Sequence, residues 1–580
     1  MTTRSACGDD GMPSGDEVGG TGSPLTMEWL VVMARCPLVT AGSYGSSDHL
    51  GEMTGDDATM TGKTGGAGRH PREGTETMTE QNSATPVAGR TVASEPAMGT
   101  TGGSAEGAAA DDSSGIAVPP LAELASRLGE GVLTTDPDII AAHARDEALF
   151  CPAEGAIALV RATSASDVQE VMRFATEHRI PVVPQGARSG ISGGANASPG
   201  AILLSVARMN DVVAVSEAER TVTVQPGIIN QDLKDHLAPF GLSYPPDPGS
   251  VGISSIGGNI ATNAGGLCCV KYGVTRDYVR SLTVVLADGT LSALGPQTAK
   301  GVAGLDMRQL FIGSEGTLGV IVEATLRLVP ALPEPFTAVA TFPDERSGLQ
   351  TVADFMAGGG VPSLFEFLDG SSLTMLNAYG DFGLDGEAGS MLIMQVDLAA
   401  AESKATMAKF AEVAHACGAL DVAYSDDPAD SAALIAARRM IQPAYEKFAG
   451  AHGGGQLLDD VCLPRAAMPE FCDRLDALRE SSGLTISLVA HAGDGNTHPS
   501  VFFDAADEVE TAKALEVFGE IMRIGLELGG TITGEHGVGY LKKDWLGEEL
   551  DAGAQRMQLA VKNALDPLGI LNPGKMLGGL

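Results

Sequence analysis

Three long glycine-rich segments, each flanked by strand-like sequence, constrain this chain more than any other feature. They occupy residues 184–195 (PQGARSGISGGA), 245–266 (PPDPGSVGISSIGGNIATNAGG) and 313–321 (GSEGTLGVI). Glycine has no Cβ, so such loops let the backbone approach a ligand and turn successive N–H groups toward an anion. Neither the G-x-G-x-x-G dinucleotide fingerprint nor a P-loop is present. The three segments together predict a cradle for a large cofactor that carries phosphate.

The sequence before the first loop predicts a β-α-β unit. Apolar strands are predicted at 156–162 and 181–185, and a helix with a periodic apolar face is predicted at 166–180. Ser166 and Gln169 have the spacing of a capping box at the start of this helix. Alternating strands and helices of this kind indicate a domain that contains both sheet and helix.

Changes in composition divide the chain into four parts. The first part is rich in Gly, Ser, Thr, Ala and Asp without any periodicity, which predicts a disordered N-terminal extension. Three prolines at 330–336 mark a stiff boundary, after which the order strand, helix, strand occurs twice, as in a ferredoxin-like domain. The predicted parts are 1–115 (disordered), 116–331 (cofactor binding), 336–528 (substrate or cap domain) and 529–580 (C-terminal segment). Long helices are predicted around 429–448, 466–480, 508–528 and 552–565.

The net charge of −37 argues against nucleic acid and anionic membrane surfaces as partners. The eight cysteines form no C-x-x-C pair, so the sequence predicts neither a disulfide framework nor a cysteine zinc site. A reducing cytoplasm is therefore the simplest compartment. No apolar run approaches the roughly 20 residues that a membrane-spanning helix needs.

The segment HAGDGNTH (491–498) places two of only ten histidines at the ends of a tight turn. A metal site, a proton shuttle and an ordinary hairpin each explain it. An apolar strand ends at His491, and a return strand starts at His498, so a hairpin would bring both imidazoles to one end of a sheet. A second strand-like segment at 529–534 leads into Glu535 and His536. Two histidines and one carboxylate are a ligand set for Zn, Mn, Fe or Co.

Taken together, the glycine-rich segments resemble the FAD-binding domain of the vanillyl-alcohol-oxidase/PCMH flavoprotein superfamily. With HAGDGNTH, GEHGVG (534–539) and LNPGKML (571–577), the chain resembles the branch that contains the FAD-binding glycolate oxidases, cytochrome-type D-lactate dehydrogenase and D-2-hydroxyglutarate dehydrogenase. The resemblance implies an α+β fold, with a PCMH-type FAD-binding domain of two subdomains. A ferredoxin-like cap domain and a helical C-terminal segment that returns to the FAD site would follow.

The resemblance also implies that FAD is the cofactor. Some members of the superfamily attach flavin covalently through histidine, but none lies in LCCVKYG (267–273), so non-covalent FAD is expected. Arg188 departs from the family, which more often has a small polar residue at that position. The residues that match the FAD motifs are Pro184, Gly186, Ala187, Arg188, Ser189, Gly193, Gly194, Pro246, Asp247, Ser250, Gly257, Gly258, Asn259, Asn263, Gly265 and Ile321.

The resemblance assigns the catalytic side chains as well. His491, His498 and Glu535 would hold a divalent metal, with Zn or Mn favoured, and His536 would be the catalytic base. The expected reaction is oxidation of a short D-2-hydroxy acid, glycolate or D-lactate, to the 2-oxo acid by hydride transfer to the flavin. Arg438, beside Arg439, matches a family arginine that contacts the substrate carboxylate. Leu458 stands where the 2-hydroxyglutarate enzymes carry a lysine, which argues against a dicarboxylate substrate.

Other functions stay open at this point. They are a D-2-hydroxyglutarate dehydrogenase, a non-catalytic flavin-binding subunit of a larger complex, and a mononuclear Fe(II) oxygenase. The glycine-rich loops speak against the oxygenase, which needs no flavin. The expected partners are a small 2-hydroxy acid and an unidentified electron acceptor, with no nucleic acid and no transmembrane segment. A homodimer is compatible with the sequence, as is a cytoplasmic protein that lies peripheral to the membrane through its electron acceptor.

Overall fold

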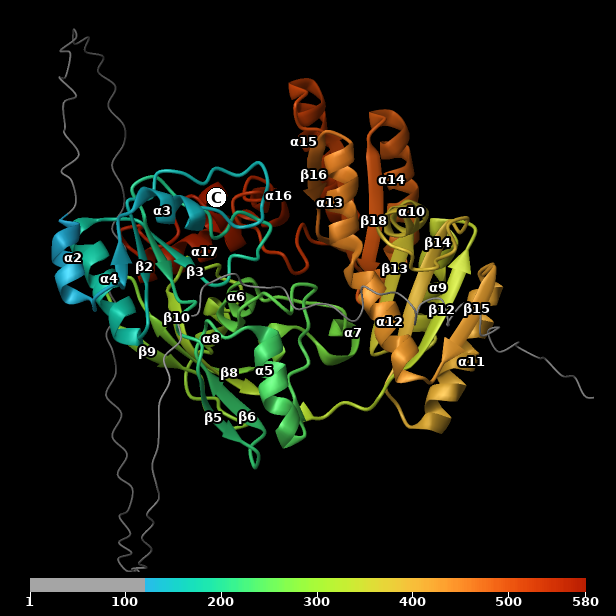
Figure 1. Cartoon of the computed structure of the whole chain (residues 1–580), viewed down its shortest axis with the longest axis horizontal. Coiled ribbons are helices and arrows are strands. Elements are labelled where there is room, and N and C mark those ends of the chain that lie inside the picture. Colours follow the sequence, from blue (N-terminus) through green and yellow to red (C-terminus); the bar gives the residue numbers. More distant parts are fainter. Residues whose placement is uncertain (1–119) are drawn as a thin grey trace, which may run out of the picture. The chain divides into compact units, whose positions relative to one another are not determined.

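The computed structural model describes residues 120–580, and the predicted disordered extension over 1–115 lies outside these residues. Two main sheets and a two-stranded one form the first part of the described chain, and one large sheet forms the second (Figure 1). None of the helices within residues 120–580 has the length and apolar character needed to cross a membrane.

The first sheet carries a helix layer on each face. Its order is β1 (Leu133–Thr134), β2 (Ala158–Arg161), β4 (Ile202–Ser205), β3 (Val182–Gln185), and its helices are α2 (Leu121–Arg127), α3 (Pro137–His143) and α4 (Ala165–His178). β4 runs parallel to both β2 and β3. Side chains alternate along each strand, so that Val160 and Leu204 pack toward α2 and α4 while Leu159 and Leu203 pack toward α3. The predicted β-α-β unit is thus confirmed as β2, α4 and β3.

The predicted capping box at Ser166 and Gln169 is wrong. Helix α4 begins at Ala165, and the Ser164 hydroxyl caps it by accepting from the backbone N–H of Asp167. The Gln169 amide instead donates to the carbonyl of Gly289 on a neighbouring hairpin. The Gln169 side chain, which the local pattern assigned to the helix cap, is therefore used in a tertiary contact instead.

The second sheet is antiparallel throughout. Its order is β5 (Val212–Ser216), β6 (Thr221–Val224), β10 (Val320–Arg327), β8 (Val279–Val285), β9 (Leu291–Leu294). Leu233 of α5 (Asn230–Leu237) and Ile260 of α6 (Ile256–Thr262) belong to its core. Shorter elements of this part are β7 (Leu242–Ser243) paired with β11 (Val329–Pro330), α7 (Cys269–Tyr272), α8 (Arg308–Phe311), and 3₁₀ turns at Ala238–Phe240 and Thr275–Asp277.

The large sheet contains the predicted ferredoxin-like arrangement. Its order is β15 (Asp421–Ser425), β12 (Phe336–Phe342), β14 (Ser390–Val396), β13 (Leu364–Asp369), β18 (Thr485–His491), β19 (Asn496–Asp504), β16 (Gly454–Leu458), and β17 (Val461–Cys462) also pairs with β19. The first four strands pair antiparallel, with the first strand in sequence beside the third and fourth. The other four strands extend this sheet beyond the predicted motif and carry the histidine hairpin.

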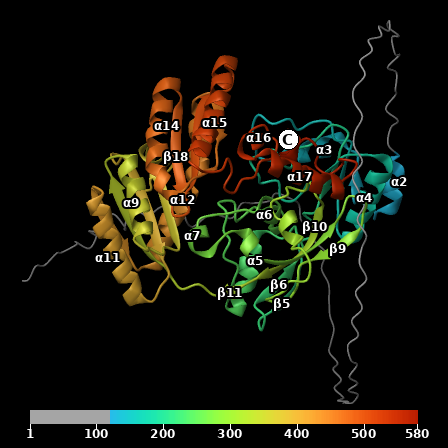
Figure 2. The same cartoon turned by 180° about the vertical axis from the view of Figure 1, so that it is seen from behind.

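Helices cover both faces of the large sheet (Figures 1 and 2). They are α9 (Glu345–Ala357), α10 (Gly370–Tyr379), α11 (Ala400–Ala416), α12 (Pro428–Arg439), α13 (Ile441–Ala451), α14 (Met468–Ser482) and α15 (Glu508–Glu527). α9, α11, α14 and α15 share one core with the sheet, and α10, α12 and α13 share another. The helix predicted at 429–448 is two helices, because α12 ends before Met440 and α13 begins after it.

The C-terminal segment packs against the first sheet. It contains α16 (Leu546–Glu549), α17 (Ala552–Leu565) and a 3₁₀ turn at Met576–Gly579, with a further 3₁₀ turn at Arg465–Ala467 earlier in the chain. Leu571 bridges to Val182 at the edge strand β3, and its side chain lies in the core of that sheet. The strand predicted at 529–534 is reduced to a single bridge between Thr531 and Cys462. This stretch is therefore held mainly by side-chain contacts.

One of those contacts gives a stability prediction. Lys542 donates to Asp459 at 2.6 Å and to the carbonyl of Ile532 at 2.6 Å, and both charged side chains are almost completely buried. Lys542→Met should lower the free energy of unfolding by about 3–5 kcal/mol, because it leaves the Asp459 carboxylate buried without its cation. Chemical denaturation measures this loss. The double variant Asp459→Leu/Lys542→Met should recover most of it, and a single variant as stable as the wild type would contradict the prediction.

Candidate functional site

The histidine hairpin consists of β18 and β19. His491 ends β18 opposite Asn496, and His498 lies opposite Val489. Because side chains on one face of an antiparallel pair lie at every second residue, His491 and His498 are diagonal neighbours on the same face. Their ring centroids are 5.0 Å apart, and both side chains are buried. The predicted hairpin therefore brings the two imidazoles together.

Glu535 lies between the two imidazoles although it comes from a different segment. Its Oε1 atom is 3.2 Å from Nε2 of His491 and 3.2 Å from Nε2 of His498. Nε2 of His536 is 3.7 Å from the same oxygen, and the His536 ring stacks on His498 with centroids 4.9 Å apart. Three imidazole nitrogens from two separate turns thus face one carboxylate oxygen.

A buried aspartate that the sequence analysis did not single out joins this cluster. One oxygen of Asp460 accepts hydrogen bonds from the Thr533 hydroxyl and from the backbone N–H groups of Glu535 and His536, at 2.7–2.9 Å. Ligand atoms of Asp460, His498, Glu535 and His536 all lie within 4.8 Å of one another, a grouping that could hold a metal ion. It contains the predicted ligands His498 and Glu535 and the predicted base His536, but not the predicted ligand His491. The available signal in the sequence was an acidic pair, Asp459-Asp460, directly after the apolar strand β16.

Glu366 is a second residue that the sequence analysis missed. It lies on β13, is fully buried, accepts from Nδ1 of His491 at 2.8 Å, and pairs with Arg438 at 2.9 Å. A carboxylate on the far ring nitrogen fixes the orientation of a histidine and leaves Nε2 for another partner. The predicted substrate arginine, Arg438, is thus already paired within the protein. Its neighbour Arg439 is more exposed and lies 3.6 Å from Asp247.

Charge coupling shifts the protonation of these groups. Burial opposes ionisation of His491, but the carboxylates of Glu366 and Glu535 raise its pKa well above the ordinary value. Burial likewise opposes ionisation of Glu535, but His491 and His498 lower its pKa well below the ordinary value. Burial lowers the pKa of His536, with Asp460 opposing the shift. The lowered pKa favours the neutral imidazole of His536 at pH 7, as a proton acceptor requires.

The first glycine-rich loop follows β3. Within the described residues, no protein acceptor takes the backbone N–H groups of residues 188–194. The Ala187 N–H donates to the Ser255 hydroxyl in the second segment. The guanidinium of Arg188 turns to the carbonyls of Ala142 and Arg145. Seven successive free N–H groups suit an anionic ligand such as a pyrophosphate.

The second glycine-rich segment contains α6 and contacts both the first loop and the histidine cluster. Asn259 accepts from the Asn230 amide, and Asn263 ends α6 in the left-handed conformation. The Asp247 carboxylate accepts from the N–H of Cys268. A Cβ atom at Gly265 would lie 2.6 Å from Glu535 Oε2, so a larger residue here would have to displace the Glu535 carboxylate. The predicted residues Pro246, Ser250, Gly257 and Gly258 lie in the same segment, and Ile321 lies on β10 with 9% exposure.

Glu315, in the third segment, joins the predicted loops to the turn that carries His536. Its backbone N–H donates to the carbonyl of Ala261, and its side chain accepts from the N–H groups of Val538 and Gly539, both at 2.8 Å. The amide of Asn572 donates to the carbonyls of Glu315 and Gly194. All three glycine-rich segments and the C-terminal segment are therefore bonded to one another around the histidine cluster.

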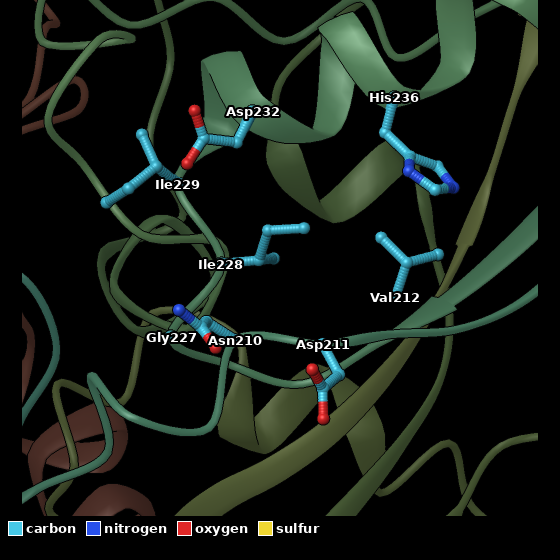
Figure 3. A pocket seen from close by; sticks show the side chains of 8 residues that line it. All are labelled: Asn210, Asp211, Val212, Gly227, Ile228, Ile229, Asp232 and His236. Atoms are coloured by element: carbon cyan, nitrogen blue, oxygen red, sulfur yellow. The ribbon is translucent and has the colours of Figure 1, made fainter. Parts of the chain in front are cut away.

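A cavity of about 340 Å³ lies elsewhere, beside α5 (Figure 3). Asp211, Asp232 and His236 line it with Ile228 and Gly227. Its acidic and histidine side chains are exposed, and within residues 120–580 they form no group with metal-ligand spacing. None of the residues that the sequence analysis assigned to catalysis or metal binding lines this cavity.

Two family models match this chain. The model of the FAD linked oxidases, C-terminal domain, matches residues 334–576, and the model of the FAD binding domain matches residues 156–295. The second match contains the first two glycine-rich segments, and the first contains the whole histidine cluster. FAD, the predicted cofactor, is thereby confirmed.

Similar sequences and structures agree with these matches. The glycolate oxidase subunit GlcD of Bacillus subtilis (strain 168) is 36% identical over 419 residues, which are 72% of this chain and 88% of that protein. The D-lactate dehydrogenase of Anaerostipes hadrus is 36% identical over 430 residues, 72% of this chain and 89% of that protein. The crystal structure of p-cresol methylhydroxylase with substrate bound has a TM-score of 0.67 over 79% of this chain and 96% of that chain, at 16% identity. The predicted superfamily, branch and PCMH-type fold are confirmed.

Glu315 gives a pH-dependent prediction. Burial raises its pKa from the ordinary 4.5 to about 7. The folded state then keeps a proton that the unfolded state releases, so this stabilisation is complete below pH 4.5 and lost as the pH rises through 7. Relative to Glu315→Gln, the wild type should lose up to about 3 kcal/mol of unfolding free energy across that window. Thermal unfolding of both proteins at a series of pH values measures the difference, and parallel stability curves would contradict it.

Proposed function

This chain belongs to the family of FAD-linked oxidases and is an FAD-dependent oxidoreductase, and from that premise we propose that it oxidises glycolate or D-lactate to the 2-oxo acid. The names of the two relatives support a short 2-hydroxy acid as the substrate. The observation that carries the proposal is the convergence of His491 and His498 on one oxygen of Glu535, beside Gly265 of the second glycine-rich segment.

The glycine-rich residues fit FAD held without a covalent bond. The free N–H groups of 188–194 suit its phosphates, and the close approach at Gly265 places that segment against the cluster. When bound, FAD accepts the hydride that leaves the substrate carbon. The contacts proposed for FAD are those of the family motifs in the three segments, including Asp247, Asn259, Asn263 and Ile321.

His491, His498 and Glu535 fit a divalent metal. The observation is the donor set itself, in which two buried Nε2 atoms and a carboxylate oxygen face one another with Glu366 behind His491. Nitrogen and oxygen donors of this kind suit Zn or Mn. An ion held there would stabilise negative charge on the substrate hydroxyl oxygen.

The remaining roles belong to side chains of the chain itself. His536, kept neutral by its lowered pKa, accepts the hydroxyl proton at Nε2, while Nδ1 faces Asp460. Arg438 is proposed to contact the substrate carboxylate and, through Glu366, also supports His491. The retained cluster disfavours a non-catalytic subunit, and Leu458 at the end of β16 disfavours 2-hydroxyglutarate.

The location and the electron acceptor are also proposals. All six cysteines within residues 120–580 are free, which supports a reducing cytoplasmic environment. We expect electrons to pass to a separate acceptor, through which the protein lies peripheral to a membrane.

Purified protein with an artificial dye acceptor tests the substrate. Glycolate, D-lactate, L-lactate and D-2-hydroxyglutarate should be compared at equal concentrations. We expect the highest kcat/KM with glycolate or D-lactate, because Leu458 cannot bind a second substrate carboxylate as a lysine at this position would. Preferred oxidation of D-2-hydroxyglutarate, or no oxidation of any 2-hydroxy acid, would contradict the proposal.

Two histidine variants distinguish the proposed role of His536 as the base from the proposed role of His491 as a metal ligand. His536→Ala should lower kcat by about 10²–10⁴-fold while FAD and metal content stay at the wild-type level, because only the proton acceptor is removed. His491→Ala should lose bound metal and turnover together. Flavin absorbance, metal analysis and steady-state rates measure these outcomes. A fully active His536→Ala, or a metal-replete His491→Ala, would remove that residue from its role.

The adjacent arginines offer a matched pair. Arg438→Gln should raise KM and also reduce metal affinity, because it breaks the ion pair with Glu366 behind His491. Arg439→Gln should leave metal affinity unchanged. If the two variants had the same KM and the same metal affinity, the assignment of Arg438 would be contradicted.

A further inference from the structure

We propose that Asp460 is a positioning residue that holds the turn of Glu535 and His536 through one carboxylate oxygen, Oδ2, and orients the ring of His498 through the other, Oδ1, while Oδ2 also lies beside the ring of His536. This inference rests on the metal role given to His498 and Glu535 in the proposed function. It concerns a residue that contacts neither substrate nor cofactor in that proposal.

The first oxygen of Asp460 substitutes for missing secondary structure. The stretch 532–537 lies in no strand or helix, so its backbone N–H groups need other acceptors. Oδ2 of Asp460 accepts from the N–H groups of Glu535 and His536 and from the hydroxyl of Thr533. The Thr533 hydroxyl in turn accepts from the N–H of Gly537. A single charged oxygen thus fixes the backbone of both a proposed ligand and the proposed base.

The Asp460 carboxylate also faces the far side of two imidazoles, with its second oxygen beside His498 and its first beside His536. Oδ1 lies 3.6 Å from Nδ1 of His498, and Oδ2 lies 3.9 Å from Nδ1 of His536. Both nitrogens and Oδ1 are buried and have no hydrogen-bond partner within residues 120–580. The Asp460 carboxylate, 3.6 and 3.9 Å from the two Nδ1 atoms, favours the tautomer with the proton on Nδ1 and a free Nε2 on both rings.

The tautomer matters because Nε2 is the atom that points toward Glu535 in both rings. A histidine can donate its lone pair to a metal, or accept a proton, only at the nitrogen that carries no hydrogen. Asp460 would thus prepare His498 for the metal and His536 for the substrate proton at once. Glu366 does the same for His491, so each proposed histidine has a buried carboxylate behind it.

Asp460→Asn tests the roles of the two oxygens separately, because it replaces one of them with an NH₂ group. The amide oxygen can keep the three donors of the turn, but the NH₂ group then faces Nδ1 of His498 and forces the proton onto Nε2. We expect the Kd for Zn²⁺ to rise about 10–100-fold, while FAD content stays unchanged. Zn²⁺ alone, titrated into the FAD-loaded protein against a chromophoric chelator, measures this.

Asp459→Asn is the matched control, since Asp459 is the adjacent buried carboxylate but faces Lys542. It should lower thermal stability and leave the Kd for Zn²⁺ within about twofold of the wild type. An equal loss of Zn²⁺ affinity in both variants would overturn the specific role of Asp460, as would an unchanged Kd in Asp460→Asn.

Thr533 keeps the test decisive if Asp460→Asn does not fold. Thr533→Val removes one of the three donors and should weaken Zn²⁺ binding measurably, by up to about tenfold. Thr533→Ser keeps the hydroxyl donor and should bind Zn²⁺ as tightly as the wild type. Wild-type Zn²⁺ affinity in Thr533→Val would overturn the inference. A wild-type protein that binds no Zn²⁺ would instead overturn the metal role itself, which distinguishes failure of the proposed function from failure of this inference.

Discussion

The arrangement of this site depends on one carboxylate oxygen that several imidazoles share. Oε1 of Glu535 lies within 3.2 Å of Nε2 on both His491 and His498. Burial of these groups would be unfavourable unless each charge had a partner, and the strongly shifted pKa values of His491 and Glu535 express that mutual stabilisation. The cluster is therefore stable only when the hairpin and the turn of Glu535 are held together, which makes their positioning a condition of the fold and of the chemistry alike.

Glycine residues help to hold the turn of Glu535 in place, because without side chains they allow neighbouring segments to approach it closely. Gly265 admits Glu535, and a Cβ atom at Gly539 would lie 2.1 Å from the carbonyl of Ser192 in the first loop. Glu315 adds two hydrogen bonds to the N–H groups of Val538 and Gly539. The segments that suit FAD are thus the same segments that support the turn of His536. Cofactor binding and positioning of the base are consequently expected to be coupled.

The sequence predicted those features that arise from local chemistry. The hairpin of His491 and His498 follows from an apolar strand, turn residues and a return strand, and the β-α-β unit follows from periodicity. Asp460 and Glu366 could not be assigned in this way, because their roles come from contacts with residues far away in the sequence, such as Glu535 for Asp460 and His491 for Glu366. The same reason explains two errors: Gln169 bonds Gly289 rather than its own helix, and the segment 529–534 is held by Asp460 and Lys542 rather than by a sheet.

The most direct test of the central claim is the flavin absorbance of the purified protein under anaerobic conditions. Glycolate or D-lactate should bleach the band near 450 nm, a wavelength typical of oxidised flavin. Removal of divalent metal with a chelator should abolish the bleaching, and addition of Zn²⁺ or Mn²⁺ should restore it, because the cluster of His491, His498 and Glu535 would be reassembled around the ion. Bleaching that proceeds equally fast without metal would contradict the account.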